Sequence, residues 1–251
     1  MPLDIENTRR LCPEHDLHYF ASIDSTMNEA AKLVARKAPH GTLVVADEQT
    51  AGMGRLGRSW QSSRDLGIYC SVLLRLPLPA ESLPLITLVL GLATAEAIEK
   101  STTAVCDLRW PNDILINERK VAGILAHLVE DYVIAGIGIN VNQTSFPAGL
   151  RTPPTSLRIE SGGATQSRES ILLNLIHSLD AFCAMLITEG PEWILRAFIS
   201  ASSYAIDRRV LIEEDGRKGV TAGIDENGFL LVRLDSGSIE KIAAGGVRPA
   251  S

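Results

Sequence analysis

The stretch Gly52-Met53-Gly54-Arg55-Leu56-Gly57-Arg58-Ser59-Trp60 contains the spacing G-x-G-x-x-G, the pattern of a dinucleotide-binding turn. Such a turn needs a strand before it, a helix that opens on the third glycine and an acidic residue about 20 residues further on. The β-branched run 42–48 predicts the strand, but residues 58–67 are polar and turn-prone, and RLPLP stands where the acid is needed. The stretch therefore argues against a Rossmann fold.

Two other nucleotide-binding loops also fail to match. A P-loop ends in Gly-Lys-Ser/Thr, whereas Gly57 is followed by Arg58 and Ser59, and the chain has neither the catalytic-loop nor the D-F-G motif of a protein kinase. What remains is a glycine loop with two arginines, Arg55 and Arg58. Their planar guanidinium groups suit phosphate and carboxylate oxygens, and the glycines let backbone N–H groups face a ligand. The alternative is a solvated surface loop.

The segments around this loop predict an α+β domain followed by a small β domain. An N-cap at Asp24-Ser25-Thr26 begins a helix that should run to about residue 38. The apolar segment 83–98 runs into Glu96 and Glu99 and is interpreted as a buried core helix rather than a membrane span. This core helix should occupy about 82–100. Further helices are predicted over 169–188 and 191–202, and strands over 42–48, 67–76, 105–110, 121–130 and 132–141, with a hairpin tip at Asn117-Glu118. From Arg208 onward, short strands separated by turns indicate a β-barrel, so we expect domains over 1–203 and 204–251.

Composition narrows the class of protein. The 251 residues carry a net charge of −6, which disfavours general nucleic-acid binding because that requires clustered Lys and Arg. The four cysteines are scattered without a C-x-x-C pair, as is typical of reduced structural thiols in the cytosol. The N-terminus has no apolar central region of a secretory signal. We therefore expect a cytoplasmic protein with no nucleic-acid or membrane partner.

Three further motifs have both a functional and a structural interpretation. In RWPND (109–113), Asn112 and Asp113 could orient a metal, a phosphate or an amine, or could simply form an Asx turn. In KVAGIL (120–125), Lys120 could clamp a phosphate with Gly123 leaving room for a ligand, or could face water from a hairpin. In GIGIN (136–140), the Asn140 amide could read a ring edge or only terminate a strand.

Taken in order, DST, EQTAGMGRLGRSW, RWPND, KVAGIL and GIGINVN resemble the motifs of the biotin protein ligases over residues 20–142. The C-terminal part, with Gly245-Gly246, is similar to that family's SH3-like domain. The resemblance implies an α+β fold in which helices pack on a mixed central β-sheet, as in the class II synthetase-like catalytic domain of biotin and lipoate ligases. A small SH3-like β-barrel would follow.

The resemblance also implies roles for individual residues. Biotin would be bound by Ser25, Thr26, Met27, Gln49, Met53, Gly54, Arg55, Lys120 and Gly123, and ATP by Arg55, Arg58, Asn112, Lys120 and Asn140. Asn112 would lie near Mg²⁺, and the catalytic residues would be Arg55, Lys120 and Asp113, with Asp113 accepting a proton from the acceptor lysine. The sequence departs from the family pattern at Met27, where asparagine is usual and a backbone contact is expected instead, and at Arg109, which replaces a common lysine. Met53 stands where arginine or lysine is common.

The implied reaction activates biotin with ATP to biotinyl-5'-AMP and pyrophosphate, and then transfers biotin to a lysine of a biotin carboxyl carrier protein, such as that of acetyl-CoA carboxylase. Two alternatives are a lipoate ligase-like acyl-adenylate enzyme and a non-catalytic biotin sensor, the latter suggested by Met53. Only about twenty residues precede the motifs, fewer than the ~50 of a small domain, so no DNA-binding arm is expected. A homodimer is an expectation by analogy with the family.

Overall fold

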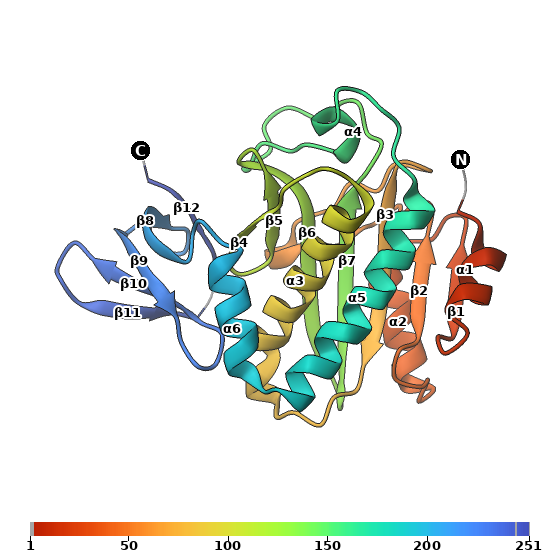
Figure 1. Ribbon diagram of the computed structural model, residues 1–251, viewed down its shortest axis with the longest axis horizontal. Helices are drawn as coiled ribbons and strands as arrows, with labels where there is room; N and C mark the ends of the chain where they lie inside the picture. Colours follow the sequence, from red (N-terminus) through yellow and green to blue (C-terminus); the bar gives the residue numbers. More distant parts are fainter. Residues whose placement is uncertain (1–2, 244, 251) are drawn as a thin grey trace.

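A seven-stranded mixed sheet forms the centre of the molecule in the computed structural model, which describes residues 3–243 and 245–250. Its strand order is β1-β2-β3-β7-β6-β5-β4; β1 and β2 are parallel, and every other neighbouring pair is antiparallel (Figure 1). The strands are β1 (Leu17–Phe20), β2 (Leu43–Ala46), β3 (Gly67–Leu74), β4 (Asp107–Arg109), β5 (Asp113–Ile116), β6 (Arg119–Val129) and β7 (Tyr132–Asn140).

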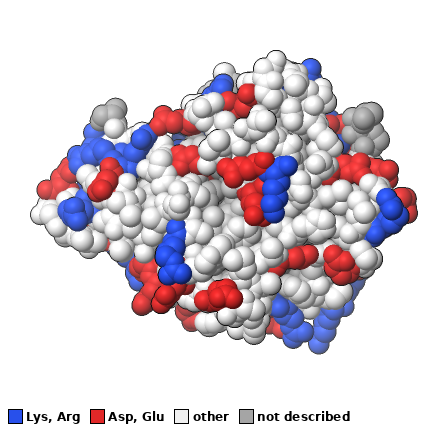
Figure 2. Space-filling model, viewed as in Figure 1, with Lys and Arg blue, Asp and Glu red and all other residues white. Residues whose placement is uncertain are grey.

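Helices cover both faces of this sheet. Alternate residues of a strand point to opposite faces, so Val45 and Val72 pack in the larger core beneath α3 (Leu83–Ser101) and α5 (Arg168–Thr188), whereas Val44 and Leu73 face α2 (Thr26–Ala35). The other helices are α1 (Ile5–Leu11), α4 (Leu157–Glu160) and α6 (Pro191–Ser200), with short 3₁₀ turns η1 (Arg55–Gly57) and η2 (Ala80–Ser82). Figure 2 shows acidic and basic side chains intermingled on the face that carries α3 and α5.

The helix α3 confirms the interpretation of its apolar sequence as a core helix. Both α3 and α5 are long and apolar enough to cross a membrane, but they pack against each other and α3 is apolar on all sides because most of it is buried. Such helices are common in the cores of proteins that do not enter membranes, so these two are weak evidence for a membrane span.

Local signals place α2 correctly, with one difference at its end. The Ser25 hydroxyl accepts a hydrogen bond from the Met27 N–H at 3.2 Å, which confirms the predicted N-cap. The helix ends at Ala35 rather than near residue 38, because Lys37 adopts a left-handed conformation with φ of 57°.

A second sheet follows α6 and is antiparallel throughout, with the order β11-β10-β9-β8-β12. Its strands are β8 (Ile206–Ile212), β9 (Lys218–Ile224), β10 (Leu230–Leu234), β11 (Ile239–Ile242) and β12 (Val247–Pro249), consistent with the expected SH3-like barrel. The Trp110 indole N–H donates to the Gly228 carbonyl at 2.9 Å and ties this sheet to the larger one. Gly228 has φ of +88°, and a Cβ there would lie 2.9 Å from the Leu85 nitrogen, so only glycine fits this contact. The predicted α+β class is confirmed.

Candidate active site

Two cavities lie beside the glycine loop. The wider one, about 330 Å³, is enclosed by the loop, the start of β5 and β6, and the second sheet, and the narrower one, about 50 Å³, lies between α2 and the strands β6 and β7. Four predicted site residues line both cavities: Gly54, Arg55, Asn112 and Lys120. The two spaces therefore meet at a pair of cations.

The glycine loop folds back on itself between β2 and β3. The Gly54 N–H donates to the Arg58 carbonyl at 2.7 Å, and the Trp60 N–H donates to the Gly52 carbonyl at 2.8 Å. Gly52 is required because a Cβ there would lie 2.5 Å from the Trp60 carbonyl oxygen. The amide of Gly54, which was expected to face a ligand, is instead used inside the loop. The turn is closed by Leu56, which has φ of 57° and is exposed.

Trp60 is brought by this turn onto a floor of two glycines. Gly123 of β6 and Gly138 of β7 pair directly across the strands, and a Cβ on Gly138 would lie 2.4 Å from the Trp60 ring. The room that Gly123 was expected to leave for a ligand is filled by Trp60 and Lys120. The Lys120 ammonium lies 5.4 Å from the centre of the indole ring, as in a cation–π contact. The indole N–H of Trp60 is buried with no hydrogen-bond partner among the described residues.

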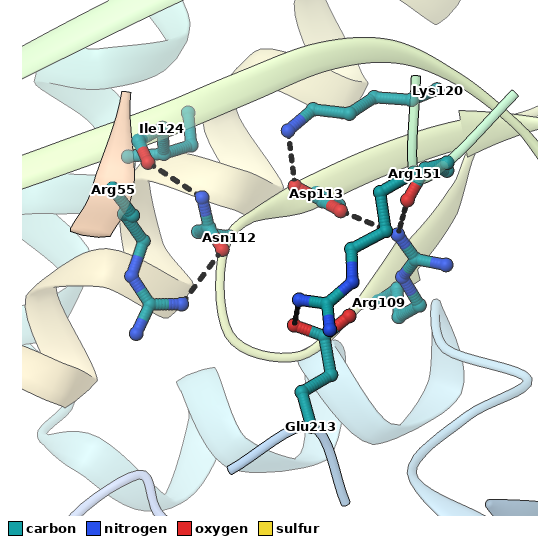
Figure 3. Close-up of polar contacts among 9 residues, drawn as sticks. Arg55, Arg109, Asn112, Asp113, Lys120, Ile124, Arg151 and Glu213 are labelled. Atoms are coloured by element: carbon teal, nitrogen blue, oxygen red, sulfur yellow. Dashed lines mark hydrogen bonds and ion pairs between the residues drawn. The ribbon is translucent and has the colours of Figure 1, made fainter. Parts of the chain in front are cut away.

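Asp113, at the start of β5, binds two cations (Figure 3). Its Oδ1 lies 2.5 Å from the Lys120 Nζ, and its Oδ2 lies 2.6 Å from an Nη of Arg109. The same Arg109 nitrogen donates to the Thr152 hydroxyl at 2.7 Å. Burial alone would raise the pKa of Asp113, but the charges of Lys120 and Arg109 outweigh burial and hold that pKa below its ordinary value. Asp113 is therefore ionised, with both oxygens occupied.

Asn112 is fixed by two hydrogen bonds. Its Nδ2 donates to the Ile124 carbonyl at 2.8 Å, which orients the amide so that Oδ1 accepts from Arg55 at 3.0 Å (Figure 3). The oxygen that was expected to approach Mg²⁺ thus faces a guanidinium, and the adjacent carboxylate is neutralised by two cations. Mg²⁺ prefers carboxylates and phosphates as ligands, so the residues present do not form a magnesium site by themselves.

Thr26 and Gln49, which line the narrow cavity, belong to a network of hydrogen bonds. The N–H and the hydroxyl of Thr26 both donate to the Gln49 Oε1, at 2.8 and 3.1 Å, and the Gln49 Nε2 donates to the Ser62 hydroxyl at 2.8 Å. Ser71 donates to the Thr26 hydroxyl at 2.8 Å. These groups hold one another in fixed orientations, as preorganised ligand contacts require.

Ser25 and Met27 lie differently from what their expected roles imply. Ser25 is fully buried, and its hydroxyl serves as the cap of α2 rather than lining a cavity. The Met27 N–H, for which a backbone contact to biotin was expected, is bonded to that hydroxyl. The Met27 side chain lines the narrow cavity instead and packs over Gly136, where a Cβ would lie 2.6 Å from its sulfur.

Comparison with known proteins identifies the family. Residues 19–143 match the model of the biotin/lipoate A/B protein ligase family, and residues 205–247 match that of the biotin protein ligase C-terminal domain. The bifunctional ligase/repressor BirA of Bacillus spizizenii is 37% identical over 90% of this chain and 71% of its own. The biotin–[acetyl-CoA-carboxylase] ligase of Mycobacterium tuberculosis is 32% identical over 89% of this chain and 86% of its own.

A solved structure shares the fold as well as the sequence. The biotin protein ligase from Aquifex aeolicus in complex with biotin and ATP superposes with a TM-score of 0.81 at 33% identity, over 93% of this chain and 97% of that one. The chain belongs to the biotin protein ligase family. The resemblance drawn from the order of motifs is thereby confirmed.

In this biotin protein ligase, the fold gathers nearly all predicted site residues at the two cavities. Arg58, Asp113 and Asn140 line the wide cavity, whereas Thr26, Met27, Gln49, Met53 and Gly123 line the narrow one. Asn140 is buried, and its amide donates to the Thr155 carbonyl at 3.0 Å. Of the predicted set, Ser25 alone lies outside both linings.

Sequence reasoning missed three residues of the ligase cavity. Trp60 ended the quoted stretch, and its position three residues beyond a glycine turn, in a chain with only three tryptophans, was the available signal. Arg151 and Glu213 face each other across the wide cavity, with 3.1 Å between Nη1 and Oε2 (Figure 3). Arg151 comes from a loop and Glu213 from the turn after β8, so nothing in the local sequence could have paired them.

Proposed function

We propose that this chain is an ATP-dependent biotin–protein ligase, which forms biotinyl-5'-AMP with release of pyrophosphate and then transfers biotin to a lysine of a biotin carboxyl carrier protein. The observation that carries the proposal is the junction of the two cavities. Arg55 and Lys120 line both spaces, so they lie where the carboxylate of a ligand in one cavity would meet the phosphate of a ligand in the other. The names of the relatives and the biotin and ATP bound in the Aquifex aeolicus enzyme support this choice of ligands.

The first half-reaction needs charge neutralisation rather than a base. A carboxylate of this kind, with a pKa near the ~4.3 of Glu, is already ionised at pH 7 and can attack the α-phosphorus of ATP, with pyrophosphate as the leaving group. Arg55, Arg58 and Lys120 would offset the repulsion between the two anions. The narrow cavity, at about 50 Å³, is far smaller than the ~300 Å³ at the lower end for ligand sites, so we expect Trp60 to move when biotin binds.

The second half-reaction does need a proton acceptor. The amine of the acceptor lysine, with a pKa of ~10.4, must lose a proton before it attacks the carbonyl carbon and displaces AMP. When Lys120 turns from Asp113 toward the phosphate, one of the two charges that lower the pKa of Asp113 is withdrawn. Asp113 then becomes more basic, and its Oδ1 is free to accept a proton from the incoming lysine ammonium. The transfer step requires both changes.

Mg²⁺, the glycine loop and the two domains would each have a further role in the ligase reaction. Mg²⁺ would enter with the phosphates of ATP, since the protein oxygens here are matched to cations of the protein. The loop 51–64 would cover the adenylate and exclude water from the mixed anhydride. The functional units would be residues 1–203, which carry the predicted site residues, and 204–251, which supply part of the wall of the wide cavity. The protein would act in the cytoplasm as a homodimer.

The decisive experiment is ATP–pyrophosphate exchange that depends on biotin, followed by labelling of a purified biotin carboxyl carrier domain. Exchange with biotin and labelling of one carrier lysine are expected. Exchange with lipoate but not with biotin would replace this proposal with a lipoate ligase-like enzyme. Saturable biotin binding without exchange would instead indicate a sensor, and Met53→Arg would then test whether the missing cation is the reason.

A further inference from the structure

We propose that Glu14, His15 and Asp180 form a binding site for a divalent transition metal, with Zn²⁺ as the best match. The site lies at the sheet edge formed by β1, whereas β4 and β5, which carry Arg109 and Asp113 of the candidate active site, lie at the opposite edge (Figure 1). The His15 Nε2 lies 2.9 Å from the Asp180 Oδ2 and 3.8 Å from the Glu14 Oε1. The three ligand atoms lie within 4.8 Å of one another.

The imidazole of His15 is oriented as a metal ligand would be. Its Nδ1 lies 2.7 Å from the Gly41 carbonyl oxygen, which can only accept, so Nδ1 carries a proton. Its Nε2 is directed at the two carboxylates and is hydrogen-bonded to Asp180, so a bound metal ion would replace the proton on Nε2. A backbone carbonyl behind the second ring nitrogen is the usual support of a metal-bound histidine. Gly41 is suited to this place because it has φ of +82° and because a Cβ there would lie 3.2 Å from the Nδ1.

The spacing and the donor types favour zinc over the hard cations. A tetrahedral Zn²⁺ with bonds of about 2.0–2.1 Å separates its ligand atoms by about 3.3 Å, between the two distances observed. One imidazole with carboxylates suits Zn²⁺, Co²⁺ and Ni²⁺, whereas Mg²⁺ and Ca²⁺ prefer oxygen ligands alone. Three protein ligands leave the fourth position to water.

Burial gives the site a rigid base and an open face. The His15 side chain is only 6% exposed, but those of Glu14 and Asp180 are 57% and 46% exposed, so an ion can reach the carboxylates from solvent. The neighbouring His40 and His177 make other contacts: the His40 Nδ1 accepts from the Arg75 N–H at 3.0 Å, and the His177 Nε2 lies 3.9 Å from the Cys12 sulfur. They are therefore not counted as ligands.

A metal at this position would join parts of the chain that are far apart in sequence. Glu14 and His15 lie in the turn between α1 and β1, Gly41 lies just before β2, and Asp180 lies in the middle of α5. A bound ion would fasten the edge strand β1 to α5, and binding to the folded chain alone would stabilise it.

The test is titration of the full-length protein with Co²⁺, followed by its visible absorption, and competition by Zn²⁺ in the presence of excess Mg²⁺. One saturable Co²⁺ site that Zn²⁺ displaces is expected, together with a higher melting temperature on addition of Zn²⁺. Asp180→Asn and Glu14→Gln change exposed side chains and should fold normally. Each should weaken this site by at least about tenfold, a range set by the loss of metal-site contacts in other proteins, and His15→Gln should abolish it.

His18→Gln is the matched control, because His18 pairs with Asp16 at 3.0 Å but has no second carboxylate in that ion pair. It should bind Co²⁺ as the wild type does. No saturable site in the wild type, or undiminished binding by Asp180→Asn, would overturn the proposal. None of these measurements depends on ligase activity, so the result is separate from that of the exchange assay.

Discussion

Asp47 and Asp113 each bind an arginine, but one pair is sealed in the core and the other lines a cavity. Asp47 and Arg168 have side chains 2% and 4% exposed and lie 2.5 Å apart; the Tyr19 hydroxyl donates to Asp47, and Arg168 also donates to the Gly67 carbonyl at 2.8 Å. Asp113 is 16% exposed and shares its oxygens between Arg109 and Lys120. The sealed pair joins the ends of the glycine loop to α5, whereas the open cluster lies where a ligand in the cavity would contact it. Access to a cavity, rather than charge, distinguishes the pair that we expect to be structural from the cluster that we propose to be functional.

Breaking the sealed pair should have the largest effect. Arg168→Ala would leave the charge of Asp47 buried without its partner and should lower the free energy of unfolding by about 3–5 kcal/mol, measured by urea denaturation. Arg196→Ala removes an exposed ion pair with Glu192 within α6 and should change the free energy of unfolding by less than about 0.5 kcal/mol. Similar losses in the two variants would show that the buried pair stabilises the fold no more than an exposed pair does.

Removing Lys120 from the open cluster should affect catalysis more than stability. Lys120→Met should slow biotin-dependent pyrophosphate exchange by about 10²- to 10³-fold, the range seen when one group that stabilises transition-state charge is lost. The fold should persist because Arg109 still pairs with Asp113. Lys100→Met, which removes an exposed lysine paired with Glu96, is the control and should exchange normally. Loss of folding in Lys120→Met would show that this cluster is structural too.

Changing the shared carboxylate should separate the two half-reactions. Asp113→Asn should slow transfer from preformed biotinyl-5'-AMP to the carrier by about 10²-fold, because the proton acceptor is lost, and should slow exchange less. Single-turnover measurements of the two steps check this. Asp131→Asn, an exposed carboxylate paired with Arg75, should leave both steps unchanged. An equal loss in both steps would assign Asp113 to holding Arg109 and Lys120 in place.

The smallest effect is expected from a change beneath Trp60, the ring that Lys120 contacts. Gly138→Ala places a methyl group 2.4 Å from the Trp60 ring and should destabilise the protein by about 1–3 kcal/mol while weakening biotin binding. Gly91→Ala, whose Cβ would lie 3.8 Å from Leu108 within α3, should be tolerated or should stabilise by up to about 1 kcal/mol. Thermal unfolding and biotin titration of both variants provide the comparison. Unchanged biotin affinity in Gly138→Ala would mean that Trp60 does not shape the pocket.

Helices and strands whose signals are local in the sequence could be predicted. The cap at Ser25, the apolar helix α3 and the strands around the glycine loop follow from capping, hydrophobicity and turn residues. The elements α1, β1 and α4 could not be predicted, because they are only 7, 4 and 4 residues long and carry little periodic signal.

The contacts within the candidate site could not be predicted from the sequence. The order of motifs selected Arg55, Asn112, Asp113 and Lys120, which the structure brings together beside the cavities. That the Asn112 oxygen faces Arg55, or that Trp60 lies on Gly138, depends on strand register and loop conformation, which are set by the whole fold. The same holds for the Met27 N–H, whose bond to Ser25 follows from the exact start of α2.

The glycine pair beneath Trp60 has a consequence for anyone who wishes to change the ligand of this protein. Gly123 and Gly138 face each other in adjacent strands, and the Trp60 ring lies in the space that larger side chains would occupy there. These three residues therefore set the depth of the pocket. Random mutagenesis of single positions would sample mostly clashes. A library that varies the three positions together, pairing a smaller residue at 60 with larger ones at 123 and 138, would move the floor of the pocket without emptying it.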